Sequence, residues 1–506
     1  MIGKKAVHAV LVMALVVVGQ WSVWAFVAQS GESLEPAIAS GVDYPNCRLG
    51  VGATRNSITT YNVTPMRFGW YIDWGAPLSP IRPAGMDYYH TLRVKQNKSG
   101  STYLPTYQIT PTLDFSPNGL GPIVQANPGS VWIIGNEPDR IFYQDESLPD
   151  MYAEIYHDAY TFIKGIDPTA KVAIGGVIQP TPVRLQYLDM VLSAYRTKYG
   201  GAMPIDVWNV HMYILQEIAG SWGASIPPGI DATTGTLFTV PQHIDTGVFS
   251  SLVRDMRTWM KSRGYQNTPL IITEYGVLFP LYLLDDYGFT QADLNDYLST
   301  VVSFLMSATD ANLGYPADNY RLVQQAALYS LDDDSLNQFG EFRWGGFLFR
   351  STAPYTLTET GSHYQSLAAS LPASVDLLPV AASTEPASLI VSPGESITLT
   401  FKVLVSNAGN SPPLSATLPV SPMVRFYDVT GGSNTLVGEV TLAPFTGCGA
   451  LREASVVWPN LSPGLYLMRV EIDPADQIEE AIESNNAMTV AILVGTHGVY
   501  LPTLRK

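Results

Sequence analysis

The sequence predicts an α/β protein in which a (β/α)8 TIM barrel is followed by a small all-β sandwich. Three observations predict this fold. The chain has 506 residues, which is long for one domain and suits a large barrel plus a smaller module. Short apolar runs alternate with helical patterns up to about residue 370. Beyond a segment rich in proline, alanine and serine, the apolar residues recur with period two, as in antiparallel strands.

The expected barrel strands are apolar on both faces, which is typical of a covered parallel sheet. Helical stripes lie between them, for example Met151, Ile155 and Ala159. Eight strands, each followed by a helix, fit a closed barrel. An open doubly wound sheet is the alternative, but no glycine-rich phosphate loop follows any strand. The predicted strands are residues 67–74, 90–95, 103–109, 131–137, 171–178, 205–213, 269–277 and 323–331.

The N-terminus predicts export. A short basic start precedes an apolar run over 6–18, and residues 23–25 (Val-Trp-Ala) fit a signal-peptidase site. The alternative is that this region is kept as a membrane anchor, since about 20 apolar residues can span a bilayer. In both cases the rest of the chain lies outside the cytoplasm, so we expect a secreted or cell-surface protein. The predicted organisation is 1–28 signal peptide or anchor, 29–64 linker and start of the barrel domain, 65–371 barrel, 372–387 linker, 388–496 sandwich and 497–506 tail.

The charge and the cysteine content argue against some classes of binding partner and cofactor. The formal net charge is −16, from 28 Lys and Arg against 44 Asp and Glu, which argues against a nucleic-acid partner. Two cysteines, Cys47 and Cys448, make neither a disulfide scaffold nor a cysteine-based zinc site. They pair with each other or stay free. The 28 Tyr and 10 Trp offer flat faces that suit sugar rings and protein cores equally well.

The last hundred or so residues predict an antiparallel sandwich, because apolar and polar residues alternate over 397–405 and 466–472. This stretch resembles the cell-adhesion-related bacterial domain, which is immunoglobulin-like. The resemblance rests on the motifs Val470-Glu471-Ile472-Asp473-Pro474 and Glu483-Ser484-Asn485-Asn486. It implies a spacer or adhesion unit. The acidic hairpin either holds calcium or is a solvated loop, and the tail, apolar and then basic, is compatible with surface attachment.

Two of the predicted strands end in a carboxylate. Residues 131–137 end in Asn136-Glu137, followed by a proline, and residues 269–277 contain Glu274. Burying a carboxylate at a strand end is unfavourable unless a site uses it. Active sites of barrels lie at the carboxyl ends of the strands. Two carboxylates that face each other across a cleft are what glycoside hydrolysis requires.

These residues resemble clan A of the glycoside hydrolases, and the likeness covers most of residues 65–370. The resemblance implies that Glu137, after Asn136 on the fourth strand, is the acid/base and that Glu274, on the seventh, is the nucleophile. His211 and Tyr213 are two residues apart and share a face of their strand. Clan members carry a similar His-x-Tyr, whose Tyr hydrogen-bonds the nucleophile. A core histidine with a backbone partner is the alternative for His211.

Further residues are candidates for contacts with the substrate. The resemblance implies that Arg93 lies near Glu274 and keeps it ionised, whereas a surface salt bridge is the alternative. A Trp often ends the eighth strand in the clan. Here Tyr329 stands there, or Trp344 reaches in from the next loop. The other candidates for sugar contacts, on the predicted strand 67–74, are Trp70, Asp73 and Trp74.

The predicted reaction is retaining hydrolysis of β-linked poly- or oligosaccharides by double displacement, with no metal and no organic cofactor. The two carboxyl groups should then lie roughly 5–5.5 Å apart. Residues 216–245 are expected to build one wall of the cleft. Transglycosylation would use the same residues. A non-catalytic sugar-binding protein and a surface adhesion protein are the rival interpretations, and the oligomeric state is open.

Overall fold

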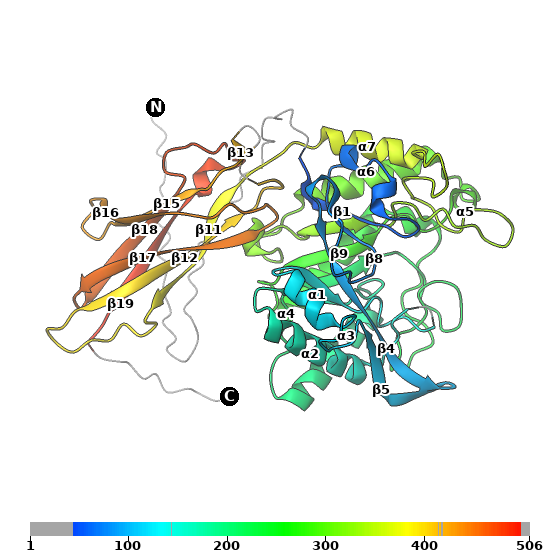
Figure 1. Cartoon of the computed structure of the whole chain (residues 1–506), viewed down its shortest axis with the longest axis horizontal. Coiled ribbons are helices and arrows are strands. Elements are labelled where there is room, and N and C mark those ends of the chain that lie inside the picture. The colour runs from blue at the N-terminus through cyan, green and yellow to red at the C-terminus, as the bar shows by residue number, and fades with distance from the viewer. Residues whose placement is uncertain (1–43, 143, 413, 416–417, 497–506) are drawn as a thin grey trace, which may run out of the picture.

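The computed structural model describes residues 44–142, 144–412, 414–415 and 418–496 (Figure 1). The signal peptide or anchor predicted at 1–28 and the tail at 497–506 lie outside the described residues. No helix among the described residues is both long and apolar enough to cross a membrane. The described chain forms an α/β domain up to about residue 371 and a β-sandwich after it.

The α/β domain is built from two sheets whose strands, apart from the β4–β5 pair, are all parallel. The first has the order β3-β2-β1-β10-β9-β8, with β1 Asn46–Gly52, β2 Phe68–Ile72, β3 Asp87–Tyr88, β8 Trp208–Met212, β9 Leu270–Tyr275 and β10 Gln325–Leu328. The second has the order β5-β4-β6-β7, with β4 His90–Ser99, β5 Thr102–Thr110, β6 Val131–Ile134 and β7 Lys171–Ile174.

The two sheets are linked along both edges. β3 runs on into β4 after one residue, and two isolated parallel bridges, Ala173–Val207 and Val177–Val210, connect β7 to the strand β8. The parallel contacts therefore lead from β1 through β2, β3 and β4, β6, β7, β8, β9 and β10 back to β1. The strands are buried because helices and loops cover one face and the opposite faces pack on one another.

Two of the strand predictions are wrong. Residues 103–109 lie in β5, which pairs antiparallel with β4 and is half-exposed, so this segment extends a hairpin and is not part of the parallel series. The first parallel strand is β1, which lies in the segment 29–64 assigned to the linker and domain start. It escaped detection because only seven residues carry it and it lies at the start of the domain. These two errors compensate, and β6 remains fourth and β9 seventh in the parallel series.

The helices do not follow every strand. α1 to α4 are Leu120–Ala126, Pro149–Ile166, Pro182–Tyr199 and Thr246–Ser262, and α5 to α7 are Leu281–Asp285, Gln291–Ser307 and Glu359–Ser370. After β1 and β2 the described chain has only 3-10 turns, η1 Ile58–Thr60, η2 Thr64–Met66 and η3 Pro83–Gly85. Proline starts or lies within two of these turns, which favours short turns over long helices. The expectation of a helix after each strand is therefore wrong at these two places.

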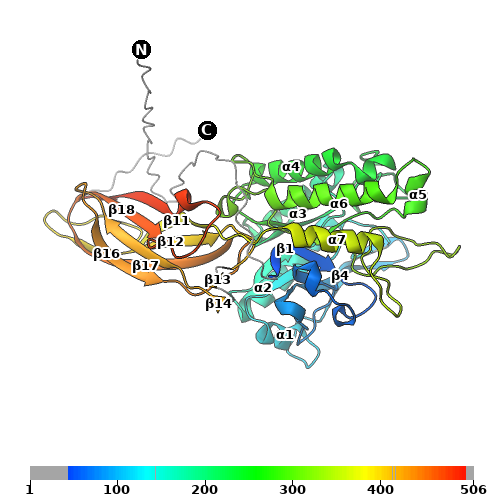
Figure 2. The ribbon, with the colours of Figure 1, turned by 90° about the horizontal axis from the view of Figure 1, so that it is seen from above.

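The second domain is a sandwich of two antiparallel sheets (Figure 2). Their orders are β11-β12-β17 and β16-β15-β18-β19, and β13 Leu414–Ser415 pairs with β14 Leu418–Pro419. Alternate apolar residues of β12 face a separate core, as the period-two pattern predicts. β11 covers most of the segment predicted as a linker. The strands are β11 Leu377–Glu385, β12 Ile397–Asn407, β15 Met423–Asp428, β16 Thr435–Thr441, β17 Ala450–Leu461, β18 Gly464–Ile472 and β19 Ala487–Val494, with a turn η6 at Glu483–Asn485.

The two domains are joined by a disulfide and by hydrogen bonds from a buried arginine. Cys47 of β1 and Cys448 of the sandwich are bonded, which decides between the two alternatives left open by the sequence. Next to them, both oxygens of Asp318 accept from the Arg48 guanidinium, at 2.7 and 2.8 Å. Arg48 also donates to the backbone oxygens of Ala408, at 2.7 Å, and Gly409, at 3.3 Å. Arg48 of the α/β domain is thus satisfied by a carboxylate of its own domain and by the backbone of the other.

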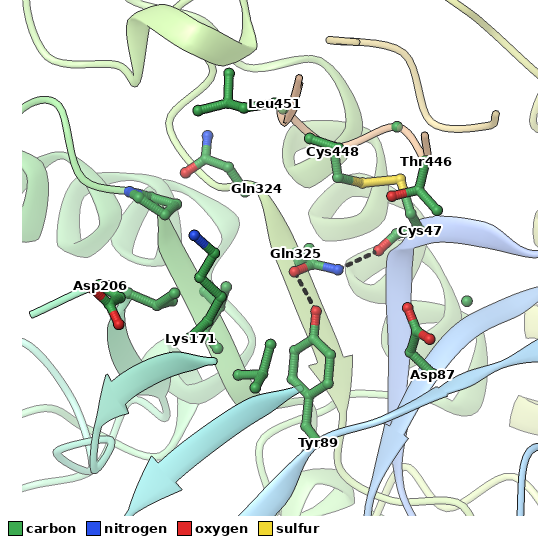
Figure 3. A pocket seen from close by; sticks show the side chains of 18 of the residues that line it. Cys47, Asp87, Tyr89, Lys171, Asp206, Gln324, Gln325, Thr446, Cys448 and Leu451 are labelled. Atoms are coloured by element: carbon green, nitrogen blue, oxygen red, sulfur yellow. Dashed lines mark hydrogen bonds between the residues drawn. A yellow bond between two sulfur atoms is a disulfide. The ribbon is translucent and has the colours of Figure 1, made fainter. Parts of the chain in front are cut away.

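A cavity of about 670 Å³ lies beside this junction (Figure 3). It opens at the amino ends of the parallel strands, near Cys47, Val131 and Lys171, and on its other side lie residues 446–452 of the sandwich. Inside it, the Tyr89 hydroxyl donates to Gln325 at 2.6 Å, and Gln325 donates to the backbone oxygen of Cys47 at 3.0 Å. The sandwich therefore packs against the end of the strand series where the strands begin.

The Arg48–Asp318 pair predicts a measurable contribution to stability. Asp318→Asn should lower the free energy of unfolding by about 3–5 kcal/mol, because it leaves the buried Arg48 charge without its counterion. Chemical denaturation measures the change. The matched control is Asp189→Asn, whose partner Arg263 is on the surface, and there we expect about 0–1 kcal/mol. Equal effects of the two substitutions would show that the buried pair does not stabilise the junction.

Candidate active site

Glu137 and Glu274 lie together at the carboxyl ends of the parallel strands. Glu137 follows β6, Glu274 lies in β9, and His211 lies in β8. One carboxylate oxygen of each glutamate and a ring nitrogen of His211 all lie within 4.8 Å of one another. All three side chains are buried. Parallel strands place their carboxyl ends on one side, so residues that are far apart in sequence meet there.

Two donors orient the Glu274 carboxylate. The Tyr213 hydroxyl donates to one oxygen at 2.8 Å, and the Trp74 indole N–H donates to the other at 2.9 Å. The same indole N–H lies 3.1 Å from the Asn136 side-chain oxygen. Tyr213 thus occupies the position relative to Glu274 that the sequence predicts. Trp74 was predicted as a sugar contact, and here its polar edge holds the carboxylate.

Glu137 is held by two basic side chains, His211 and Arg140. His211 Nδ1 lies 3.0 Å from one of its oxygens and the Arg140 guanidinium 3.1 Å from the other. Its backbone has a φ of +47°, a conformation that non-glycine residues adopt rarely and that is often found at functional sites. Gly176, whose carbonyl accepts from the Glu137 backbone N–H, leaves the necessary room. A side chain at position 176 would lie 2.6 Å from the His211 ring.

The electrostatics of the two carboxyl groups differ. Burial raises the pKa of Glu137, but the hydrogen bond from His211 and the charge of Arg140 outweigh it and bring the pKa well below its usual value. Burial also raises the pKa of Glu274, where the attraction of His211 is weaker than burial and the Glu137 charge together. His211 itself has a raised pKa, because the two carboxylates outweigh its burial. In the resting site the acidic proton therefore favours Glu274 over Glu137, the reverse of the ionisation that the sequence predicts.

Arg140 is the functional neighbour that the sequence analysis missed. It stands three residues after Glu137 in the stretch Asn-Glu-Pro-Asp-Arg, so its position alone was a signal. Arg93 was predicted beside Glu274, with a salt bridge as the alternative, and the structure shows the salt bridge. Arg93 donates to Asp145 at 2.8 Å and to Gln144 at 3.2 Å, and its side chain is 41% exposed. Arg93 lies in β4. Through Asp145 and Gln144 it holds the loop after β6.

Asn136 lies between the two carboxylates and this loop. Its side-chain N–H donates to Gln144 at 3.2 Å, while its backbone N–H donates to Asp145 at 2.9 Å. Asp145 is 4% exposed and also accepts from the backbone of Val94 at 2.9 Å. Asn136 is therefore held at the site by a buried carboxylate that the sequence analysis did not single out.

Of the sugar contacts predicted on the segment 67–74, one is contradicted. Trp70 is fully buried and stacks on Tyr89 with ring centroids 4.3 Å apart, inside the strand series, so this prediction is wrong. Asp73 is exposed and accepts from the Tyr88 hydroxyl and from the backbone of Gly75, and its contact with a sugar stays a prediction. Only Trp74 reaches the carboxylates.

Aromatic side chains continue the site beyond Glu274. Tyr329 packs edge-on against both Trp74 and Tyr213, with centroids 5.9 and 6.3 Å apart, and its hydroxyl donates to Asp333 at 2.5 Å. Trp344 packs with Tyr329 against a buried apolar cluster around Tyr213. The sequence left open which of the two replaces the missing tryptophan. The structure brings both to the same side of Glu274.

The same three residues are the group among the described ones that could hold a metal ion. Two carboxylates and an imidazole suit zinc or non-haem iron. In the described arrangement, however, the two ring nitrogens of His211 face different carboxylates, Nδ1 towards Glu137 at 3.0 Å and Nε2 towards Glu274 at 3.6 Å. A metal needs one ring nitrogen and both carboxylates to converge on a single point. The arrangement fits an imidazole placed between two carboxylates better than a ligand set.

No family model matches the chain, and no curated protein matches it. Solved structures similar to most of it are glycoside hydrolases. The GH39 enzyme from Xanthomonas axonopodis pv. citri is 13% identical with a TM-score of 0.41, and the match covers 84% of this chain and 93% of that chain. A GH128 (subgroup I) endo-beta-1,3-glucanase from Amycolatopsis mediterranei, in complex with laminarihexaose, is 16% identical with a TM-score of 0.38, covering 63% and 98%. The CARDB domain of the PF1109 protein from Pyrococcus furiosus is 20% identical with a TM-score of 0.19, covering 24% and 88%.

The raised pKa of His211 predicts a pH-dependent stability. The contribution of the imidazolium is fully present below about pH 6.5, the unfolded value, and is lost as the pH rises through the higher folded pKa. The free energy of unfolding should therefore fall as the pH rises above about 6.5, by about 1.4 kcal/mol for each tenfold difference in proton affinity between the folded and unfolded states. In His211→Gln this part of the fall should vanish. Denaturation at several pH values measures it, and parallel pH curves for the two proteins would contradict the assignment.

Proposed function

We propose that this protein is an exported, retaining glycoside hydrolase that cleaves β-linked poly- or oligosaccharides. One observation carries the proposal: oxygens of Glu137 and Glu274 lie within 4.8 Å of each other at the carboxyl ends of parallel strands. Retaining enzymes need two carboxyl groups roughly 5–5.5 Å apart, whereas inverting enzymes need roughly 6.5–9.5 Å to admit a water molecule. The close approach therefore favours direct attack by one carboxylate on the sugar.

We also infer that the eight parallel segments form a closed (β/α)8 barrel. The parallel contacts that run from β1 around to β10 and back support it. The missing helices after β1 and β2 are the departure from the regular pattern. In such a barrel the sugar binds at the carboxyl ends of the strands, where both glutamates lie.

In the proposed reaction, Glu274 is the nucleophile. Its carboxylate oxygen forms a bond to the anomeric carbon, the glycosidic C–O bond breaks, and Glu137 gives its proton to the leaving oxygen. Water then attacks the glycosyl ester, gives a proton to Glu137 and releases the sugar with retained configuration. Tyr213 and Trp74 hold the attacking carboxylate by hydrogen bonds of 2.8 and 2.9 Å. Asn136 is placed to bind the sugar hydroxyl next to the reacting carbon.

Glu137 must acquire a proton before it can act as an acid. Its pKa is low in the resting site because of His211 and Arg140. His211 lies between the two carboxyl groups, with Nδ1 3.0 Å from Glu137 and Nε2 3.6 Å from Glu274. It can therefore pass the proton from Glu274 to Glu137, which ionises the nucleophile and protonates the acid. A sugar that separates Arg140 from Glu137 would raise the pKa of the carboxyl group and draw the proton across. Substrate binding and protonation are then linked.

The ionised Glu137 also favours a second candidate, a sugar-binding protein without catalysis. A carboxylate locked by Arg140 and His211 can accept hydrogen bonds from sugar hydroxyls but cannot act as an acid. For both candidates we propose a location outside the cytoplasm. The Cys47–Cys448 disulfide supports it, because such bonds persist in oxidising compartments.

Two substitutions test the catalytic roles. Glu274→Gln should abolish release of reducing ends from the β-linked polysaccharides that the protein cleaves. Glu137→Gln should slow that cleavage by about 10²–10⁴-fold, but much less for an aryl glycoside whose leaving group needs no proton. Azide should restore the activity of this variant by replacing the base-activated water.

Glu439→Gln, an exposed residue of the sandwich, is the control and should behave as the unaltered protein. NMR of the first product formed from a β-glycoside should show the β-anomer. The α-anomer would exclude double displacement. Binding of glycans without any cleavage would favour the sugar-binding candidate.

Metal removal tests the remaining interpretation of the triad. Activity should survive dialysis against EDTA, because the two ring nitrogens of His211 face different carboxylates and no step in the scheme uses a metal. Loss of activity that zinc or iron restores would show that Glu137, His211 and Glu274 are ligands instead.

A further inference from the structure

We infer that Trp222 is a remote sugar-binding platform, so that the cleft takes an extended glycan chain and not only the sugars next to the cleaved bond. The inference rests on the proposed function and specifies its substrate class. Trp222 lies in the loop between β8 and η4 Pro241–Ile244, and half of the residue is exposed. This loop follows the carboxyl end of β8, so it is on the same face as the glutamates. An exposed indole offers the flat apolar face on which a sugar ring stacks.

A chain of apolar and aromatic contacts leads from Glu274 to Trp222. It starts with Tyr213, which donates to Glu274 and packs against Tyr329. Tyr213, Leu215 and Leu278 form one buried cluster, with Tyr329, Trp344 and Phe279 packed on its edge. Trp222 then packs edge-on against Phe279, with ring centroids 5.8 Å apart. Apolar contacts, most of them buried, therefore connect the nucleophile to the exposed indole.

The loop that carries Trp222 is braced by a fully buried arginine. Arg184 of α3 donates to the backbone oxygens of Ala224 at 2.6 Å and Ser225 at 2.7 Å, just after Trp222. The same guanidinium donates at 2.9 and 2.5 Å to the backbone and side chain of Asp139, two residues after Glu137. It also pairs with Glu217 at 3.1 Å. One buried cation thus ties the Trp222 loop to the loop of the acid/base.

A second buried residue, His243, connects the loop after β8 to the loop after β9. His243 stays neutral, since burial lowers its pKa to about 4. Its Nδ1 donates to the backbone oxygen of Ile214 at 3.2 Å, and its Nε2 accepts from Leu278 at 2.8 Å. The His243 ring also packs on Phe279, with centroids 4.1 Å apart. The loops after β8 and β9 are therefore held together under Trp222.

The backbone next to Trp222 is also constrained. Gly223 has a φ of +98°, and a side chain there would lie 2.4 Å from the backbone oxygen of Gln216. The Gln216 side chain donates to the Trp222 backbone oxygen at 3.2 Å. A large apolar side chain that is half-exposed on a well-held loop contributes little to the stability of the fold. It is useful when a ligand covers the indole, because no ordering of the loop is then needed on binding.

The test compares Trp222→Ala with a matched control, Phe115→Ala. Phe115 is also an exposed aromatic, 60% exposed, but it follows β5 and packs against Phe162 near the last turn of α2, outside the contacts that lead to Trp222. The readout is the ratio of kcat/KM on a six-sugar oligosaccharide of the cleaved linkage to kcat/KM on the aryl glycoside of the same sugar. Trp222→Ala should lower this ratio about tenfold, Trp222→Tyr should restore most of it, and Phe115→Ala should leave it unchanged.

An unchanged ratio in Trp222→Ala would overturn the inference. If the protein cleaves nothing, the proposed function fails, and gel electrophoresis through the same panel of polysaccharides still decides about Trp222. Retardation of the unaltered protein that Trp222→Ala loses and Phe115→Ala keeps would support the platform. Equal migration of the three proteins on every polysaccharide would overturn it.

Discussion

The interaction on which the site depends is the mutual burial of Glu137, His211 and Glu274. Burying three ionisable groups together at the ends of neighbouring strands would be strongly unfavourable without partners, because desolvation disfavours each charge. The partners come from four different parts of the chain: Tyr213, Trp74, Arg140 and the carboxylates themselves. Each hydrogen bond both offsets the cost of burial and fixes an orientation. The geometry that permits chemistry is thus the geometry that permits the burial.

The walls of the site are arranged on the same principle. Arg184 and His243 are buried polar residues whose hydrogen bonds all end on loop backbones or on acidic side chains of those loops. Loops at the carboxyl ends of parallel strands have no sheet of their own to hold them. Buried side chains supply the missing partners, and the loops after β6, β8 and β9 become a rigid rim. A rigid rim presents its exposed aromatic groups at a fixed distance from the carboxylates.

The sandwich occupies the opposite end of the strands. Arg48, Asp318 and the Cys47–Cys448 disulfide join it where the strands begin, next to the 670 Å³ cavity (Figure 3). This placement leaves the carboxyl ends uncovered. The second domain can therefore contact a surface or a partner without blocking the face that carries Glu137 and Glu274. Its position separates the catalytic role that we propose for the α/β domain from the spacer or adhesion role predicted for the sandwich.

The sequence by itself determined the class of each domain and the central residues of the site. Local periodicity reports burial, so apolar runs predicted most of the parallel strands and alternation predicted the sandwich. A carboxylate at the end of a buried run is a local signal as well, and it predicted Glu137 and Glu274 as a pair, whereas the hydrogen bond of Tyr213 to Glu274 was implied by the resemblance to clan A. Only the tertiary structure decided which groups meet. Arg140 pairs with Glu137, and Arg93 pairs with Asp145. Trp70 lies inside the core, β5 forms a hairpin with β4, and Cys47 is bonded to Cys448. The reason is physical. A periodic pattern depends on neighbours a few residues away, whereas the partner of a charge, a thiol or an aromatic ring is set by chain segments hundreds of residues distant, which no local pattern records.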